Sequence, residues 1–519
     1  MTLSVLITEC LQRDFIGPVG AHDPLPNKLH IGRQESLRLM GRDPQLGPVA
    51  QVMDWARAQP EDRLAILHVR DWHDDGDPRQ RDHLQMFGAH CVGGTPGSAL
   101  VLGLDQGTAE RPNEHVIDSG TLNDFEDSEL PGQLERILAL AGDQPVRVGV
   151  VGVWTEAKVS FLLYDLKTRA HVNELATCSA LTASASRAQH FNALDQLRKV
   201  LGVRVCDSVG EFAEWLNPEG PAPTLRRGRE SYRPQLRVDG QQGTIDRADR
   251  DLLSFLYRDS SAVELDTLAG GYSGALVYQA ASVDAVGHAH APSVAKLGPR
   301  EMIAAERVAF ERVEAILGNR APAIRGYVDL GERAGIKYSY AAMGRGGVRT
   351  FQSLFQGGLE QERVDGILRE VFEEILEPFY AAAHYERLPL AAYYTFSPEH
   401  VASVARNVAR VHGPGGDADE LRLPDGRMIP NVTRFYAEQA PALLRNSGEY
   451  HYVSYVHGDL NGANILMDGR DNLWIIDFFH TARGHVLQDL LKLENDLLYI
   501  YTPVESEADL IEALRISEN

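Results

Sequence analysis

The sequence has few cysteines, few basic residues and no long apolar run. Four cysteines in 519 residues exclude a disulfide framework, and all four lie in the first 206 positions. No apolar stretch approaches the ~18 to 20 residues that cross a bilayer, and the first residues lack a basic signal segment. The sequence has 51 Lys and Arg and 73 Asp and Glu, which gives a formal net charge of −22. We therefore expect a cytoplasmic protein that binds neither nucleic acid nor a membrane through its overall charge.

The first 216 residues alternate apolar runs of strand length with segments of helical period. The expected strands cover 4–8, 64–69, 146–152 and 203–206, and the expected helices cover 48–57, 133–140 and 156–169. Strands that alternate with helices form a parallel sheet with helices on both faces. The sequence thus predicts an α/β domain over 1–216.

A segment that is rich in proline, glycine and arginine is followed by a different pattern of expected strands and helices. We interpret 217–235 as a linker. Residues 236–519 contain short strands, a glycine-rich turn, a strand that carries a lysine, a helix over 300–317 and further long helices. This order predicts a second domain, of the α+β class, over 236–519.

Phosphoryl transfer needs a backbone cradle for phosphates, a cation, carboxylates for Mg²⁺ and a group that orients the attacking hydroxyl. The turn LAGGYSGALVY supplies the candidate cradle, and its candidate phosphate-binding residues are Gly270, Gly271, Ser273 and Gly274. Lys296 in SVAKLG is the candidate cation. Glu301, Glu306 and Glu311 on the next helix could anchor that lysine, and Glu306 is our choice; a solvated helix face is the alternative.

The segment YVHGDLNGANILMDGRDNLWIIDFFHTARG carries the most specific signal. Asp459 and Asn464 are five positions apart, and Asp477 ends an apolar strand 18 positions after Asp459. One hairpin can bring such residues to one point as a hydroxyl-orienting carboxylate and two oxygen ligands for Mg²⁺.

These motifs resemble the aminoglycoside phosphotransferase branch of the protein-kinase-like fold, over about 263–501. The resemblance implies a two-lobed kinase-like domain that uses ATP and Mg²⁺. It makes Asp459 the catalytic-loop carboxylate, Asn464 and Asp477 the magnesium ligands, and Lys296 the lysine that pairs with the phosphates. HGD and DFF, in place of the HRD and DFG of protein kinases, favour the small-molecule branch. Asp489 falls where that family has an acidic residue that braces the catalytic loop.

The first domain contains a candidate metal site. Asp71 and His73 in HVRDWHDDGDP face the same way in an extended segment, and His90 in FGAHCVGGTPG could be a third ligand. One carboxylate and two imidazoles suit Zn²⁺, Fe²⁺ or Mn²⁺. A generally polar loop is the alternative.

These segments resemble the isochorismatase-like hydrolases, and among them the nicotinamidases, over about 2–216. That family uses a cysteine nucleophile with an aspartate and a lysine, which form an Asp-Lys-Cys triad. In this chain GVWTEAKV puts Lys158 at the nucleophile position, and Cys10 stands at the position of the family's first aspartate. The position of the family lysine falls on Asp118 or Ser119, depending on one gap.

Cys10, Asp118 and Lys158 are therefore the family's three residue types in exchanged positions. One hypothesis is a permuted triad in which Lys158 lowers the pKa of Cys10 and Asp118 orients Lys158. A second hypothesis is a domain that has lost the hydrolysis and still binds a metabolite, and a third is a purely structural domain.

The sequence as a whole predicts an enzyme: an ATP- and Mg²⁺-dependent phosphotransferase fused to an isochorismatase-like domain. The expected acceptor is a hydroxyl of a small molecule or of a macromolecule, and the isochorismatase-like family leads us to expect self-association. The alternative is a regulatory or conflict-type scaffold in which both domains bind ligands without efficient turnover.

Overall fold

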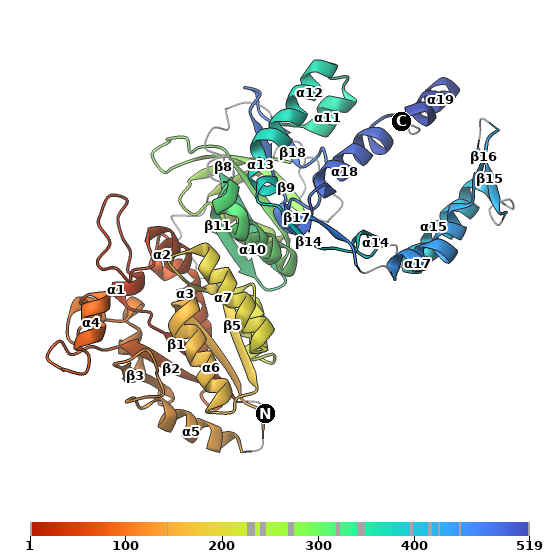
Figure 1. The fold of residues 1–519 in the computed structure, drawn as a ribbon. Coiled ribbons are helices and arrows are strands. Elements are labelled where there is room, and N and C mark those ends of the chain that lie inside the picture. The colour runs from red at the N-terminus through yellow and green to blue at the C-terminus, as the bar shows by residue number, and fades with distance from the viewer. Residues whose placement is uncertain are drawn as a thin grey trace. The chain divides into compact units, whose positions relative to one another are not determined.

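The structure is a computed structural model of all 519 residues. It describes residues 3–109, 111–142, 144–225, 234–238, 245–267, 275–317, 322–339, 348–394, 398–413, 418–423, 426–445 and 448–516. The chain divides into two compact units (Figure 1). The first contains residues 1–315 and 323–341, and the second contains 316–322 and 342–519.

The first unit begins with a six-stranded parallel sheet of order β3-β2-β1-β4-β5-β6. Its strands are β1 (Ser4–Glu9), β2 (Leu64–Asp71), β3 (Glu114–Ser119), β4 (Arg147–Val153), β5 (Glu174–Ala183) and β6 (Arg204–Cys206). The central strands are apolar along their whole length because both faces of the sheet are covered. The expected strands within this sheet are confirmed, while β3 and β5 were not predicted.

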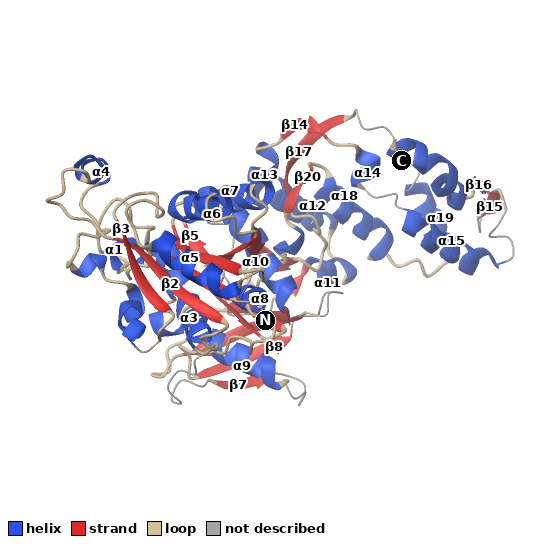
Figure 2. Cartoon of the chain, turned by 90° about the horizontal axis from the view of Figure 1, so that it is seen from below, coloured by secondary structure: helices blue, strands red, loops and turns tan. Residues whose placement is uncertain are grey.

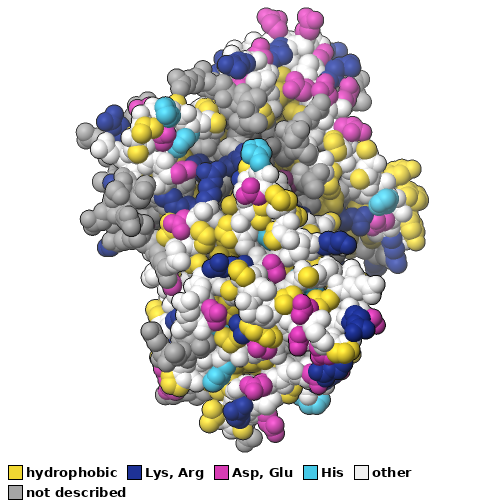
Figure 3. Space-filling model, turned by 90° about the vertical axis from the view of Figure 1, so that its left-hand side faces the viewer, with side chains coloured by type: hydrophobic (Ala, Val, Ile, Leu, Met, Phe, Trp, Pro, Cys, Tyr) yellow, Lys and Arg dark blue, Asp and Glu magenta, His cyan; other side chains and the backbone are white. Residues whose placement is uncertain are grey.

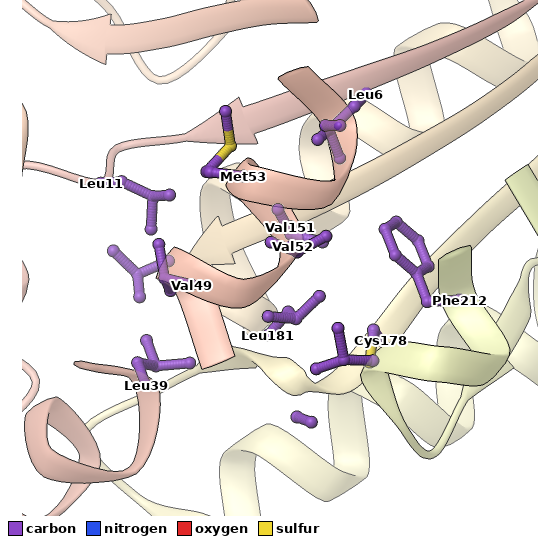
Figure 4. Packing of buried hydrophobic residues seen from close by; sticks show 14 of the residues in the cluster. Leu6, Leu11, Leu39, Val49, Val52, Met53, Val151, Cys178, Leu181 and Phe212 are labelled. Atoms are coloured by element: carbon purple, nitrogen blue, oxygen red, sulfur yellow. The ribbon is translucent and has the colours of Figure 1, made fainter. Parts of the chain in front are cut away.

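Helices cover both faces of this sheet (Figure 2). The helices are α1 (Arg13–Ile16), α2 (Arg33–Met40), α3 (Pro48–Arg57), α4 (Arg81–Phe87), α5 (Leu130–Ala141), α6 (Ser160–Thr168), α7 (Arg187–Val200) and α8 (Val209–Leu216). On one face, Leu6 and Val151 pack against α2, α3 and α8 (Figure 4). On the other face, Val5 and Ile7 pack against α5, α6 and α7. Successive residues of β1 thus enter opposite cores.

The first unit also contains a second six-stranded sheet, of order β11-β12-β10-β9-β8-β7. All its neighbouring strands are antiparallel except β7 and β8. Its elements are β7 (Gln235–Val238), α9 (Arg247–Leu256), β8 (Ala262–Thr267), β9 (Leu276–Val283), β10 (Ser293–Pro299), α10 (Arg300–Leu317), β11 (Ala323–Leu330) and β12 (Arg333–Ser339). The helix expected over 300–317 is confirmed as α10.

The second unit is mainly helical, and its described residues form three small antiparallel sheets, β13-β18-β19, β14-β17-β20 and β15-β16. Its strands are β13 (Arg349–Thr350), β14 (His384–Arg387), β15 (Glu420–Arg422), β16 (Met428–Pro430), β17 (Tyr450–Val456), β18 (Ile465–Met467), β19 (Leu473–Ile475) and β20 (Ala482–His485). Its helices are α11 (Phe351–Gln356), α12 (Gln361–Arg369), α13 (Glu377–Ala381), α14 (Leu390–Tyr393), α15 (Pro398–His412), α16 (Val432–Arg434), α17 (Ala440–Leu444), α18 (Gln488–Asn495) and α19 (Glu507–Ile516).

The predicted fold class, a parallel α/β domain followed by a mixed-sheet α+β domain, is confirmed. Among the described residues, none of the helices has the length and apolarity needed to cross a membrane. On the face drawn in Figure 3, acidic side chains are interspersed with basic, apolar and neutral ones. The net negative charge is therefore not gathered into one block on that face.

Candidate functional site

Lys296 and Glu306 form a buried ion pair in the first unit. Lys296 lies on β10, in register with Val277 of β9 and Ile336 of β12. Its Nζ atom is 2.8 Å from Oε2 of Glu306 on α10. Tyr338 donates a hydrogen bond of 2.9 Å to Oε1 of the same carboxylate. Both members of the pair are buried, so neither ionised group faces open water.

Glu306 is therefore the one of the three candidate acids that meets Lys296. Glu301 is exposed, and Glu311 instead accepts a hydrogen bond of 2.9 Å from Arg307. The candidate cradle residues Gly270, Gly271, Ser273 and Gly274 lie outside the described residues.

Asp459 lies in the second unit, in the loop that follows β17. Its side chain is 36% exposed, so solvent reaches it. Asn464 Nδ2 donates to the Asp459 carbonyl oxygen at 2.9 Å, and Asn461 Nδ2 donates to Asp459 Oδ2 at 3.2 Å. Lys492 on α18 places Nζ 3.7 Å from Asp459 Oδ1. The loop thus fixes the carboxylate at the surface with a cation beside it.

Asp489 on α18 holds the start of this loop. Its carboxylate accepts the backbone N–H groups of His457 and Gly458, both at 2.8 Å, and the Tyr380 hydroxyl at 3.0 Å. Asp489 is fully buried. Gly458 has φ of 87°, and a Cβ atom there would lie 2.3 Å from the carbonyl oxygen of His480. Glycine in the HGD motif is therefore required by both conformation and space.

The hairpin of β18 and β19 brings Asn464 and Asp477 to its open end. The Ile476 N–H donates to the Asn464 carbonyl oxygen at 3.0 Å, so Asp477 is one residue beyond this bond. Asp477 has a left-handed backbone, with φ of 65°. Asn464 is buried and Asp477 is half-buried. Asn464 therefore lies immediately before β18 and Asp477 lies two residues after β19, at the same end of one small sheet.

Lys158 lies in the first unit at the centre of a buried acidic cluster. It belongs to a π-helical turn, Thr155–Val159, that follows β4. Its Nζ atom is 2.5 Å from Asp124 Oδ1, 3.0 Å from Asp71 Oδ1 and 3.9 Å from Glu9 Oε1. It also donates to the Thr121 carbonyl oxygen at 2.8 Å. One ammonium thus lies beside three buried carboxyl groups.

Burial and the charges within this cluster together shift the pKa values of its members. Burial and the nearby Asp124 raise the pKa of Glu9 well above its usual value. Burial also opposes ionisation of Asp71, yet Lys158 and then His73 hold the pKa of Asp71 below its usual range. For Lys158, burial is outweighed by Asp71 and Asp124, which raise its pKa. Lys158 is therefore a fixed cation and not a neutral amine nucleophile.

Three imidazoles gather next to Asp71. The ligand atoms of His73, His83 and His90 all lie within 4.8 Å of one another. Asp71 Oδ2 is 3.7 Å from His73 Nε2 and 4.0 Å from His90 Nε2. The structure therefore brings the predicted Asp71, His73 and His90 together and adds His83, which was not predicted.

The tautomers of this imidazole cluster fit a divalent metal ion. His73 Nδ1 is 2.9 Å from Gln80 Oε1, and His90 Nδ1 is 2.7 Å from the Gly88 carbonyl oxygen. Since these oxygens accept hydrogen bonds, each ring carries its proton on Nδ1 and points an Nε2 lone pair into the cluster. The His73 Nε2 atom is buried without a hydrogen-bond partner. Burial and the neighbouring imidazoles lower the pKa of His83 to about 4, which keeps it neutral.

The permuted triad is wrong in two respects. Asp118 does not orient Lys158: its side chain is 48% exposed and pairs with Arg70 Nε at 2.6 Å. Ser119, the alternative position, is buried with Oγ 3.4 Å from Lys158 Nζ. Cys10 does lie beside the cluster, where its Sγ donates to Glu9 Oε1 at 3.0 Å. However, burial and Asp71 raise the pKa of the Cys10 thiol and outweigh Lys158, which does act to lower it, so no thiolate is favoured.

The sequence analysis missed Glu9, Asp124 and His83 as members of the first site, and Lys492 in the second. Asp124 follows the end of β3 by five residues, in a segment without regular period. Glu9 was visible beside Cys10, and its place at the end of a buried strand was the available signal.

A model of the family described as Ternary complex associated domain 9 matches residues 261–422 and 399–519. The search of curated proteins found no match.

Solved structures give matches of two kinds. A pyrazinamidase/nicotinamidase from Streptococcus mutans is 23% identical, with 39% of this chain and 99% of that chain covered and a TM-score of 0.32. An aminoglycoside-3'-phosphotransferase of type VIII is 17% identical, with 52% and 93% covered and a TM-score of 0.29. An aminoglycoside phosphotransferase from Streptomyces rimosus, in complex with ADP and streptomycin, is 15% identical, with 47% and 86% covered and a TM-score of 0.26. The solved structures similar to this chain thus include both nicotinamidases and aminoglycoside phosphotransferases.

Proposed function

We propose that the chain is an ATP- and Mg²⁺-dependent phosphotransferase that phosphorylates a hydroxyl group of a small molecule or of a macromolecule. The observation that carries the proposal is the buried ion pair of Lys296 and Glu306. An ion pair removed from water is costly unless it is well satisfied or serves a function. A lysine on a strand, anchored by a glutamate on the next helix, suits the binding of nucleotide phosphates.

The loop after β17 supplies the other groups that the reaction needs. Asp459 is exposed enough to accept a hydrogen bond from an acceptor hydroxyl and to take its proton. As the new bond forms between that oxygen and the γ-phosphorus, the bond between the phosphorus and its bridging oxygen breaks, and ADP leaves. Asn464 and Asp477 would hold Mg²⁺, which neutralises charge on the transferring group.

The test is Mg²⁺-dependent ATP turnover by the full chain. We expect Asp459→Asn to lower kcat by roughly 10²- to 10⁴-fold, because a general base is lost. Asp471→Asn is the matched control. Asp471 lies in the turn between β18 and β19, its carboxylate is 70% exposed, and it pairs with Arg363 of α12. Turnover that survives Asp459→Asn, or a chain that neither binds nor hydrolyses ATP, would refute the proposal.

We further propose that the first domain binds a metabolite at a divalent metal ion and does not perform cysteine-based hydrolysis. The supporting observation is that Lys158, at the position of the family nucleophile, is already engaged by three buried carboxyl groups. His73, His83 and His90 would hold the ion, and Zn²⁺, Fe²⁺ or Mn²⁺ would act there as a Lewis acid.

Two measurements test this second proposal. Elemental analysis of the full chain should find a divalent metal that is lost in His73→Ala. Release of ammonia from nicotinamide should be absent. Ammonia release that disappears in Cys10→Ala would restore the hydrolase hypothesis.

The scaffold alternative predicts that both domains bind ligands and that neither turns over. The description of the matched family, which names a ternary complex, supports a search for partner proteins under that alternative. An ATP-induced rise in Tm without Mg²⁺-dependent turnover would favour it over the phosphotransferase.

A further inference from the structure

Helix α10 presents adjacent residues to two different sheets. Glu306 reaches Lys296 on β10 and Tyr338 on β12, in the second sheet. The next residue, Arg307, reaches into the first, parallel sheet. Neighbouring positions of an α-helix are about 100° apart around its axis, so the two side chains leave the helix in different directions. Both are buried, with exposures of 0% for Glu306 and 2% for Arg307.

The Arg307 guanidinium is held by a residue within β5 and by the residue that follows β6. Its Nη2 atom donates to Ser179 Oγ on β5 at 2.9 Å and to the carbonyl oxygen of Asp207, just after β6, at 2.8 Å. Its Nη1 atom donates to Glu311, one turn along α10, at 2.9 Å. The guanidinium lies 5.0 Å from the centre of the Tyr327 ring. These contacts use the planar fork of arginine, which a lysine ammonium cannot reproduce.

A second group of contacts joins α10 to α7 of the first domain (Figure 1). Arg187 Nη1 lies 3.6 Å from Glu311 Oε2, and Arg312 forms a two-bond pair with Asp195 at 2.9 and 3.0 Å. The Arg312 and Asp195 side chains are 23% and 31% exposed. Arg307 is therefore the most deeply buried of the three arginines in this interface and the one next to Glu306.

We propose that Arg307 is a positioning residue for phosphoryl transfer: by fixing α10 to the parallel sheet it holds Glu306 against Lys296. This inference rests on the proposed phosphotransferase function. A displacement of about 1 Å in a positioned group can cost ~100-fold in rate, and the separation of 2.8 Å between Lys296 and Glu306 leaves little room for α10 to move. The isochorismatase-like domain thus supplies part of the support of the phosphate-binding lysine.

The experiment measures kcat and KM for ATP of the full chain. Arg307→Lys keeps the positive charge and removes the planar guanidinium. We expect kcat to fall about tenfold, with a much smaller change in KM and an unchanged fold. Glu311→Gln, which removes the negative charge that pairs with the guanidinium, should give a smaller fall and serves if Arg307→Lys fails to fold. Arg312→Ala is the matched control on the same helix and should leave kcat near that of the natural chain.

A double variant separates positioning from general damage. If Arg307 acts through Glu306, then Arg307→Lys combined with Glu306→Gln is no slower than Glu306→Gln alone, because the second change has nothing left to disturb. If the fall in kcat of the double variant is the product of the falls of Arg307→Lys and Glu306→Gln, the inference is overturned. It is also overturned if Arg307→Lys and Glu311→Gln both keep the kcat of the natural chain. A natural chain without ATP turnover refutes the proposed function and this inference with it, a result distinct from an active chain in which the losses multiply.

Discussion

Replacing Asp489 with asparagine keeps the shape of this side chain and removes its charge. The carboxylate accepts two backbone N–H groups and one hydroxyl, from His457, Gly458 and Tyr380, and it is fully buried. An asparagine has one acceptor oxygen, and its NH₂ group would face one of the two backbone N–H donors. At least one N–H donor of the loop after β17 would then be buried without a partner.

The size of the effect follows from these contacts. A hydrogen bond to a charged group contributes about 1.5–3 kcal/mol, and an unsatisfied buried donor costs about 1–3 kcal/mol. We expect Asp489→Asn to reduce the free energy of local opening of the loop by about 2–4 kcal/mol. Since 1.4 kcal/mol is tenfold in an equilibrium, exchange of the His457 and Gly458 amide hydrogens should accelerate by roughly 30-fold or more.

Hydrogen exchange by mass spectrometry, on peptides that contain residues 457 and 458, measures this change directly. Asp468→Asn is the control, because Asp468 is a buried acceptor of the Arg470 and Asn472 N–H groups in the turn between β18 and β19. It should speed exchange in its own turn and leave residues 457 and 458 as they were. Unchanged exchange at 457 and 458 in Asp489→Asn would refute the bracing role of Asp489.

Three further changes have expected outcomes. Lys158→Met leaves three buried carboxyl groups without their cation, so we expect a loss of about 3–5 kcal/mol in the free energy of unfolding at pH 7, measured by urea titration; an unchanged midpoint would contradict it. Glu9 has a raised pKa, so the stability it contributes is full below its unfolded value of 4.5 and is lost as the pH rises through its folded pKa. Glu9→Gln should therefore flatten the decline of Tm with rising pH above 4.5, and a slope equal to that of the natural chain would show that Glu9 is ionised. His83→Ala should reduce the bound metal per chain, whereas retention of the full amount would remove His83 from the proposed ligand set.

Regular periodicity made the scaffold of both sites predictable. The run from Ser4 to Thr8 and the helix over 300–317 follow simple patterns, and the three candidate acids on that helix could be named because it follows the Lys296 strand. The hairpin that carries Asn464 and Asp477 was predictable because its spacing is short and its strands are apolar.

The altered site was less predictable, because irregular backbone decides which side chain enters it. Asp118 ends up at the exposed side of β3, while Asp124, six residues later, turns back to Lys158. A shift of one residue along a strand reverses the face, and this is why the choice between Asp118 and Ser119 could not be made from spacing. The hydrogen bonds of Arg307 to Ser179 and Asp207 join residues that are 128 and 100 positions apart, and no local sequence pattern records such contacts.

Contacts of β11 and of the start of α10 with α8 affect whether residues 1–216 can be separated from the rest of the chain. Removal of residues 1–216 would leave the Asp329 carboxylate without the Gly210 N–H, 2.7 Å away, and Arg300 without Glu214. Gly210 itself allows this approach, since a Cβ atom there would lie 2.6 Å from Asp329 Oδ2. A fragment that lacks residues 1–216 would therefore expose Asp329 and Arg300, which are buried in the intact chain, so we expect it to be less stable than the full chain.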